Sequence, residues 1–244
     1  MKLLLITKRE SDISKIFRSL ADVVMVSPYE TDVPKFEDFD GMAILGGTDD
    51  NALILNGYLR EKCEAFSETG KPIFLEYVNS FACVYSASRV SVTPHRLVAC
   101  DDLNDDITKG SLLDSRCNSY IRPHFLMPET IPLLYYKQFT PAHDRLKDIS
   151  GDDFEKDIAL FKSKNLLFAA FRMCDYVKAG FSPKRRWNSL MWYICEFLGI
   201  PTSVEPLISG DDVAKTTGDF HADLDVAITN ALELLKEYLV LKDG

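Results

Sequence analysis

The amino-terminal half of the chain alternates short apolar runs with stretches whose apolar residues recur every three or four positions. Residues 3–6 form a continuous apolar run, which predicts a strand covered on both faces. A helix is predicted next, because Ser11 and Asp12 precede an apolar stripe that ends at Leu20. Residues 22–26 supply a second strand. Strand, helix and strand at this spacing indicate a βαβ unit.

A third strand and a second helix follow. Residues 41–45 form an apolar run that ends in Gly46-Gly47. Helix-capping residues come directly after the glycines, and the apolar spacing then predicts a helix over residues 52–67 that Gly70 ends.

Residues 71–87 form the segment most relevant to function. Residues 73–77 are of strand length, and Asn79 and Ser80 can cap a short helix, so the segment reads as strand, sharp turn and helix. The carboxyl ends of parallel strands face the ligand crevice of an open α/β sheet, so we expect the site there. The candidate ligand-binding residues are Gly46, Gly47, Thr48, Glu76, Tyr77, Asn79, Ser80 and Arg172.

Two interpretations fit Gly46-Gly47. Backbone amides at a glycine turn before a helix can bind an anion, but a tight strand-to-helix turn also needs glycine. We favour the tight turn, because two glycines alone are weak evidence for a ligand. The G-x-G-x-x-G spacing of dinucleotide-binding proteins is absent.

The later part of the chain predicts a hairpin and a long helix. Residues 158–161 and 166–171 are apolar runs with a short polar turn between them, which indicates a β-hairpin. A helix with one apolar face follows, from Trp187 to Leu198, and Gly199 ends it.

These elements predict one α/β domain with a mostly parallel central sheet over residues 1–200. Residues 201–244 are predicted to form a linker and a carboxyl-terminal amphipathic helix, which could pack on the domain, on a second copy or on a neighbouring domain of a longer chain. Self-association into a homo-oligomer is a further expectation.

Charge and cysteine usage exclude several classes of protein. The formal net charge of the 244 residues is −9, and without a continuous basic surface nucleic acid is not an expected partner. The first apolar run is too short for a signal peptide, and no stretch approaches a membrane span. Six cysteines occur without C-x-x-C spacing, which favours reduced thiols, a cytoplasmic location and no zinc site.

The order of these elements resembles a known family. The runs 3–6, 41–47 and 71–77, with 166–171 ahead of Arg186-Trp187, are similar to class I glutamine amidotransferase-like, flavodoxin-related proteins. The resemblance covers about residues 1–200. Within the superfamily it is closest to the trehalose-utilisation (ThuA-like) proteins and to non-catalytic amidotransferase-like domains found with glycoside hydrolases. The resemblance implies a flavodoxin-like three-layer α/β/α fold.

The same resemblance provides a test of activity. Amidotransferases of this class carry a cysteine on the elbow, which is the sharp turn between a strand and the following helix. They also carry a histidine in an H-x-E motif. This chain has Glu76-Tyr77 at the elbow, and the next cysteine, Cys83, lies on the predicted following helix. None of the four histidines belongs to an H-x-E motif; they are His95, His124, His143 and His221. We therefore do not expect glutamine hydrolysis by the family mechanism.

Glu76 admits a catalytic and a structural interpretation. A carboxylate at a strand end can act as a general acid or base, or accept hydrogen bonds from sugar hydroxyls. Arg172 ends a strand at the same edge, and an ion pair between Glu76 and Arg172 is the slightly favoured expectation. A two-carboxylate glycosidase would also need a second acid opposite Glu76. Candidates by topology are Asp49, Asp50 and Asp175.

Two functions follow from these observations. The favoured hypothesis is a catalytically degenerate amidotransferase-like domain that acts as a binding or interaction module, with the link to carbohydrate metabolism resting on the resemblance. The alternative is a hydrolase of a small polar or sugar substrate in which Glu76 acts with Asn79, Ser80 and Arg172. We expect no cofactor and no metal, and a small polar or carbohydrate ligand. The sequence establishes no catalytic residue; the candidates are Glu76 and Arg172.

Overall fold

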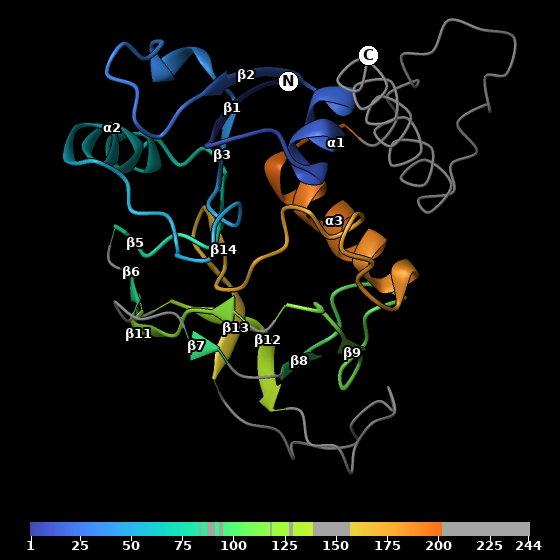
Figure 1. Ribbon diagram of the computed structural model, residues 1–244. Coiled ribbons are helices and arrows are strands. Elements are labelled where there is room, and N and C mark those ends of the chain that lie inside the picture. The colour runs from blue at the N-terminus through green and yellow to red at the C-terminus, as the bar shows by residue number, and fades with distance from the viewer. Residues whose placement is uncertain are drawn as a thin grey trace, which may run out of the picture.

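A nine-stranded sheet forms the centre of the computed structural model, which describes residues 1–82, 84–86, 91–92, 95–117, 119–126, 129–138 and 157–201 (Figure 1). Five neighbouring strands run parallel, and the remaining strands continue the same sheet antiparallel. In spatial order the strands are β2 (Asp22–Val26), β1 (Lys2–Thr7), β3 (Gly41–Leu45), β4 (Ile73–Glu76), β14 (Leu166–Ala169), β13 (Ile158–Ser163), β12 (Ile131–Gln138), β8 (His95–Ala99) and β9 (Leu112–Leu113).

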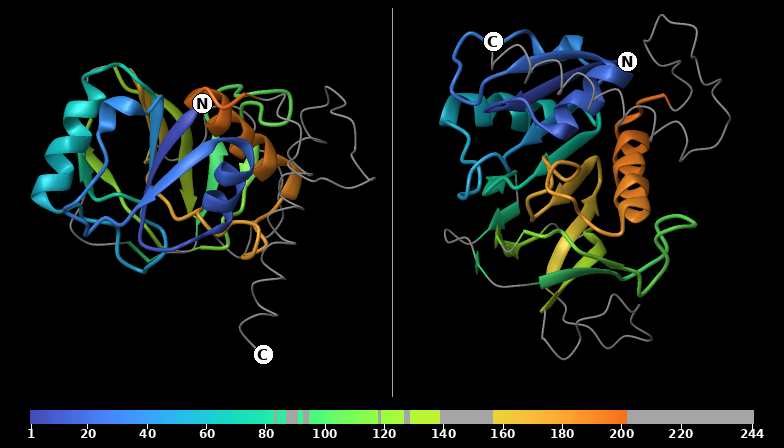
Figure 2. Two further views of the ribbon diagram at one scale, coloured as in Figure 1. Left: turned by 90° about the horizontal axis from the view of Figure 1, so that it is seen from above. Right: turned by 45° about the vertical axis from the view of Figure 1, so that its right-hand side comes forward.

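Helices cover both faces of this sheet. Figure 2 shows α2 on one side of the strands and α1 with α3 on the other, which is the three-layer α/β/α arrangement that the sequence predicts. Of the strands between these helices, β3, β4 and β14 are buried along their whole length. The helices are α1 (Asp12–Leu20), α2 (Gly57–Ser67) and α3 (Lys184–Leu198), with one 3-10 turn, η1 (Phe36–Asp38).

Local signals explain the elements that the sequence predicts correctly. Ser11 caps α1 through a reciprocal pair of hydrogen bonds with Ser14. The hairpin of β13 and β14 turns at Lys164, whose φ of 53° is left-handed, and α3 ends at the left-handed Gly199. Trp187 of α3 is fully buried.

The predicted helix over residues 52–67 begins later than expected. Asn56, and not one of the polar residues after Gly47, accepts a hydrogen bond from the amide of Leu59 and caps α2. Leu53 instead bridges to Val78 beside the end of β4. The segment before α2 therefore crosses the carboxyl edge of the sheet in an extended conformation.

The short helix predicted after Asn79-Ser80 is wrong. The chain forms two short strands there, and Ser80 does not cap a helix, because its hydroxyl accepts a hydrogen bond from Arg60 of α2. Ala82 turns with φ of 48°, and its amide donates to Glu64, again on α2. Side-chain partners on α2 thus override the local capping signal. The outlying strands are β5 (Ser80–Phe81), β6 (Val84–Ser86), β7 (Ser91–Val92), β10 (Ser119–Tyr120) and β11 (Pro123–Phe125).

Two further predictions concern residues that the structure describes only in part. The predicted linker and final helix over 201–244 lie outside the described residues, apart from Pro201. Within the described part of the chain, no helix is both long and apolar enough to cross a membrane.

Candidate functional site

The chain turns sharply where β4 ends. Tyr77 has a φ of 55°, in the left-handed region that non-glycine residues rarely adopt. Two contacts hold it there: its amide donates to the carbonyl of Ala169, and its buried hydroxyl donates to the carbonyl of Asp50 at 2.9 Å. The predicted strand and sharp turn are therefore present, with a tyrosine at the vertex, although short strands follow instead of a helix.

The carboxylate of Glu76, the last residue of β4, is bound entirely by backbone. Its Oε2 accepts hydrogen bonds from the amides of Gly46 and Gly47, at 3.0 and 2.7 Å. Its Oε1 accepts from the amides of Met173 and Cys174, at 2.6 and 3.1 Å. The residue has no exposed surface. We call these four amides, from the loops after β3 and β14, the amide cradle.

The two glycines are explained by close approach to the elbow. A Cβ atom at Gly46 would overlap the carbonyl oxygen of Tyr77 and lie 2.7 Å from the Cβ of Leu53. A Cβ atom at Gly47 would overlap Oε1 of Glu76. The glycine pair therefore forms both a tight turn and an anion site. The anion is the Glu76 carboxylate of the chain itself, which accepts hydrogen bonds from the amides of the turn.

Burial and hydrogen bonding act on Glu76 in opposite directions. Removal from water raises the pKa of this carboxyl from 4.5 to about 6, although the four amide donors lower it. All four neighbours are donors, and an ionised carboxylate is the form that offers only acceptors. At neutral pH, above this pKa, the side chain is charged and each of its oxygens accepts two of the four donors.

The expected ion pair between Glu76 and Arg172 is wrong. The guanidinium of Arg172 donates to the carbonyl of Gly47 at 3.0 Å and to the carboxylate of Asp50 at 2.9 Å. The amides saturate Glu76 from within the fold, so the arginine extends to the rim instead. There it pairs with a side chain that is 96% exposed, while its own is 24% exposed.

The three acids considered as a second catalytic carboxylate are all in ion pairs at this rim. Asp49 pairs with Lys8, which lowers the pKa of that carboxyl, and Asp175 pairs with Arg9 at 2.7 Å. Asp50 is the partner of Arg172. A hydrolase that used Glu76 would have to withdraw it from the amide cradle and free one of these acids, and no observation favours that rearrangement.

Thr48, Asn79 and Ser80 make no hydrogen bond to the Glu76 carboxylate. The Asn79 amide donates to the carbonyl of Leu53, and Ser80 faces α2. Thr48 Oγ1 is buried without a hydrogen-bond partner among the described residues. Cys83, His143 and His221 lie outside the described residues, and His95 and His124 are described by their backbone alone.

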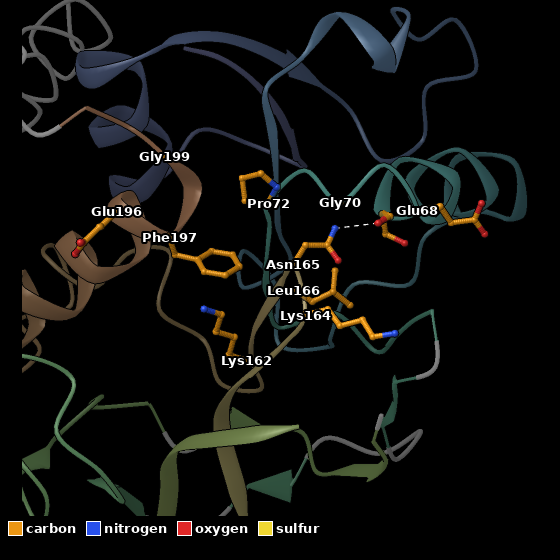
Figure 3. Close-up of a pocket in the computed structure, with 11 residues that line it drawn as sticks. Glu68, Gly70, Pro72, Lys162, Lys164, Asn165, Leu166, Glu196, Phe197 and Gly199 are labelled. Atoms are coloured by element: carbon orange, nitrogen blue, oxygen red, sulfur yellow. Dashed lines mark hydrogen bonds between the residues drawn. The ribbon is translucent and has the colours of Figure 1, made fainter. Parts of the chain in front are cut away.

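A cavity of about 1000 Å³ lies at the opposite end of the sheet (Figure 3). It opens between the carboxyl ends of α2 and α3, where Asn165 donates to the carbonyl of Ser67 and Lys162 approaches the Phe197 ring. None of the candidate residues borders it. Its lining residues are Ser67, Glu68, Gly70, Pro72, Lys162, Lys164, Asn165, Leu166, Glu196, Phe197 and Gly199.

Sequence reasoning missed two contributors to the site. Met173 and Cys174 take part through backbone amides, which no side-chain pattern reveals. Burial raises the pKa of the Cys174 thiol well above its usual range, which disfavours the thiolate form. The available signal was topological: β14 runs parallel to β4, so the residues after both strands reach the same edge.

Neither a protein-family profile nor a curated protein matches the sequence. Among solved structures, the chain is similar to a Thermoplasma acidophilum protein assigned as part of a GMP synthase, with TM-score 0.52, 12% identity, and 82% of this chain and 93% of that chain covered. It is also similar to α-L-fucosidase isoenzyme 2 from Paenibacillus thiaminolyticus, with TM-score 0.50, 10% identity, and 81% of this chain covered. The match spans 33% of the fucosidase chain.

A glutamine amidotransferase from Thermotoga maritima matches 98% of both chains at 12% identity, with TM-score 0.45. At such identities structural likeness shows the fold alone. The chain has the flavodoxin-like α/β fold of glutamine amidotransferase-like proteins.

Proposed function

We propose that this protein is a catalytically degenerate amidotransferase-like domain that acts as a binding or interaction module. The observation that carries the proposal is the amide cradle. The acid at the elbow is buried and saturated by four amides, and the vertex is occupied by a buried tyrosine. Neither group is placed to touch a substrate.

We further propose a ligand of small polar or carbohydrate character. Two observations support it: the elements resemble those of ThuA-like proteins and of domains associated with glycoside hydrolases, and a third of a fucosidase chain is similar in structure. The proposed location is the cytoplasm, which the five free cysteines among the described residues support.

The surface best suited to binding a ligand or partner lies beside the turn after β4, where the side chain of Tyr77 is buried. Tyr29, Ile54 and Tyr58 are large apolar residues with exposed side chains. A hydrogen bond from Asn56 to the carbonyl of Pro28 joins the segments that carry them. Lys8, which pairs with Asp49, lies 5.7 Å from the centroid of the Tyr29 ring. Exposed tyrosine rings beside charged groups are suited to sugars and to protein partners alike.

A thermal-shift screen against sugars, sugar acids and glutamine tests the proposal, because a ligand that binds only the folded state raises the melting temperature. We expect a shift with a sugar or sugar acid that Tyr29→Ala and Tyr58→Ala abolish. Ile131→Ala is the matched control, since Ile131 is exposed on the antiparallel half of the sheet. Turnover of any substrate that Glu76→Gln removes would overturn the proposal in favour of the hydrolase.

Light scattering tests the proposed self-association. A dimer or larger assembly that the tyrosine substitutions dissociate would identify the partner as a second copy of this chain. A monomer at every concentration would contradict self-association and leave the small ligand as the proposal to pursue.

A further inference from the structure

We infer that the amide cradle is a carboxylate-binding site in its own right, which the chain fills with the side chain of Glu76. A free carboxylate of matching size would occupy it once that side chain is shortened. This inference is independent of any sugar or partner that the surface binds.

The cradle is held by contacts that do not involve the Glu76 side chain. The amide of Gly46 also donates to the backbone carbonyl of Glu76 at 2.8 Å, and the carbonyl of Gly47 accepts from Arg172. On the other side, the carbonyl of Cys174 accepts from the amide of Ile13, at the start of α1. Both loops are therefore anchored to elements that remain when the carboxylate is removed.

The chemistry of the cradle selects an anion with two oxygens. Four N–H groups converge in two pairs, one pair on each carboxylate oxygen, and none of the four positions is an acceptor. Acetamide would turn its NH₂ group toward one pair of donors, and chloride would leave at least one pair unsatisfied. Carboxylates are therefore preferred over neutral and monatomic competitors.

The size of the site is set by the residue that occupies it. Glu76→Ala removes a CH₂–COO⁻ group, which has the volume of acetate, and Glu76→Gly removes a group with the volume of propionate. The walls are close, because even a methyl group at Gly47 would overlap Oε1 of Glu76. A protein interior at close packing penalises both voids and excess atoms. The preferred carboxylate should therefore change with the substitution.

The test is thermal and urea denaturation of Glu76→Ala and Glu76→Gly in sodium acetate, formate, propionate and chloride and in acetamide, with the ionic strength held constant. We expect both variants to unfold at lower temperature than the wild type. Acetate should raise the midpoint of Glu76→Ala most, and propionate that of Glu76→Gly, with a rise that grows with the logarithm of concentration. The wild type and Glu61→Ala, at an exposed position on α2, should show no such preference.

A variant that does not fold in chloride is still informative. In that case circular dichroism should show refolding on addition of the matched carboxylate. The inference is overturned if carboxylates stabilise the two variants no more than chloride or acetamide does, or if neither variant refolds in its matched carboxylate.

Discussion

At the scale of single residues, Glu76 is held as a protein holds a bound ion. Backbone amides supply every contact to its carboxylate, and no side-chain cation shares the site among the described residues. Backbone donors are fixed by the fold, so they cannot follow a change in the side chain they bind. The free energy of unfolding should therefore depend strongly on which atoms occupy the cradle.

Glu76→Gln should lower the free energy of unfolding by about 2–5 kcal/mol, because one oxygen is replaced by an NH₂ group that faces two N–H donors. Urea denaturation measures the loss. Glu61→Gln, on the exposed face of α2, should change stability by less than about 0.5 kcal/mol. Equal effects of the two substitutions would contradict the structural role of the cradle.

The raised pKa of Glu76 predicts a specific pH dependence. The folded state binds the proton more tightly than the unfolded state, because the pKa rises from 4.5 to about 6 on folding. The contribution of Glu76 to stability is therefore largest below pH 4.5, and it falls by about 2 kcal/mol as pH rises through 6. Urea midpoints of wild type and Glu76→Gln from about pH 4 to 7 should isolate this change. A difference that is independent of pH would refute it.

At the scale of elements, the sequence predicted those whose signals are local. The capping serines of α1, the turn between β13 and β14, and the glycine that ends α3 lie within the elements they define. The start of α2 and the strands after the elbow were missed, because contacts distant in sequence decide them: Leu53 pairs beside β4, and Ser80 binds Arg60. Local propensity cannot report such partners.

The candidate site divides in the same way. The elbow, its acid and the glycine pair were recognisable, because strand ends and glycines are visible in a sequence. The hydrogen-bond partner of Glu76 could not be predicted, because an arginine side chain and a backbone amide can each satisfy a carboxylate. Which of the two contacts Glu76 depends on how the loops after β3 and β14 pack around its carboxylate, and this packing is not visible in the sequence.

Gly46→Ala tests the fit of the turn after β3 against the elbow. The added methyl would overlap the backbone carbonyl of Tyr77, which cannot rotate away, so we expect a loss of about 3 kcal/mol. Gly57→Ala is the matched control, because a Cβ there meets no atom within 4 Å and helix formation favours alanine. Chemical denaturation of both variants measures the difference. A Gly46→Ala variant as stable as Gly57→Ala would mean that the turn is looser than described.

At the scale of the whole molecule, the cavity between α2 and α3 and the turn after β4 lie at opposite ends of the sheet. The cavity borders the amino ends of β4 and β14, whereas the amide cradle lies at their carboxyl ends. The rim over the cradle is occupied by three ion pairs between exposed or half-buried side chains. Such pairs contribute little to stability, about 1 kcal/mol at most.

Purified protein should release no ammonia from glutamine above the level of a heat-denatured control. The turn after β4 carries a buried tyrosine and not a cysteine, and no H-x-E motif is present in the sequence. A coupled ammonia assay on wild type and Cys83→Ala is the measurement. Activity that disappears in Cys83→Ala would show that catalysis survives through another arrangement.

The amide cradle joins parts of the chain that lie far apart in the sequence. Met173 and Cys174 bind a carboxylate that lies 97 and 98 residues earlier in the chain, and Gly46 lies on the far side of β4 from them. Closing so long a loop is entropically costly and raises the contact order. Hydrogen exchange at these two amides should therefore require global unfolding, so their protection factors would report the stability of the entire domain.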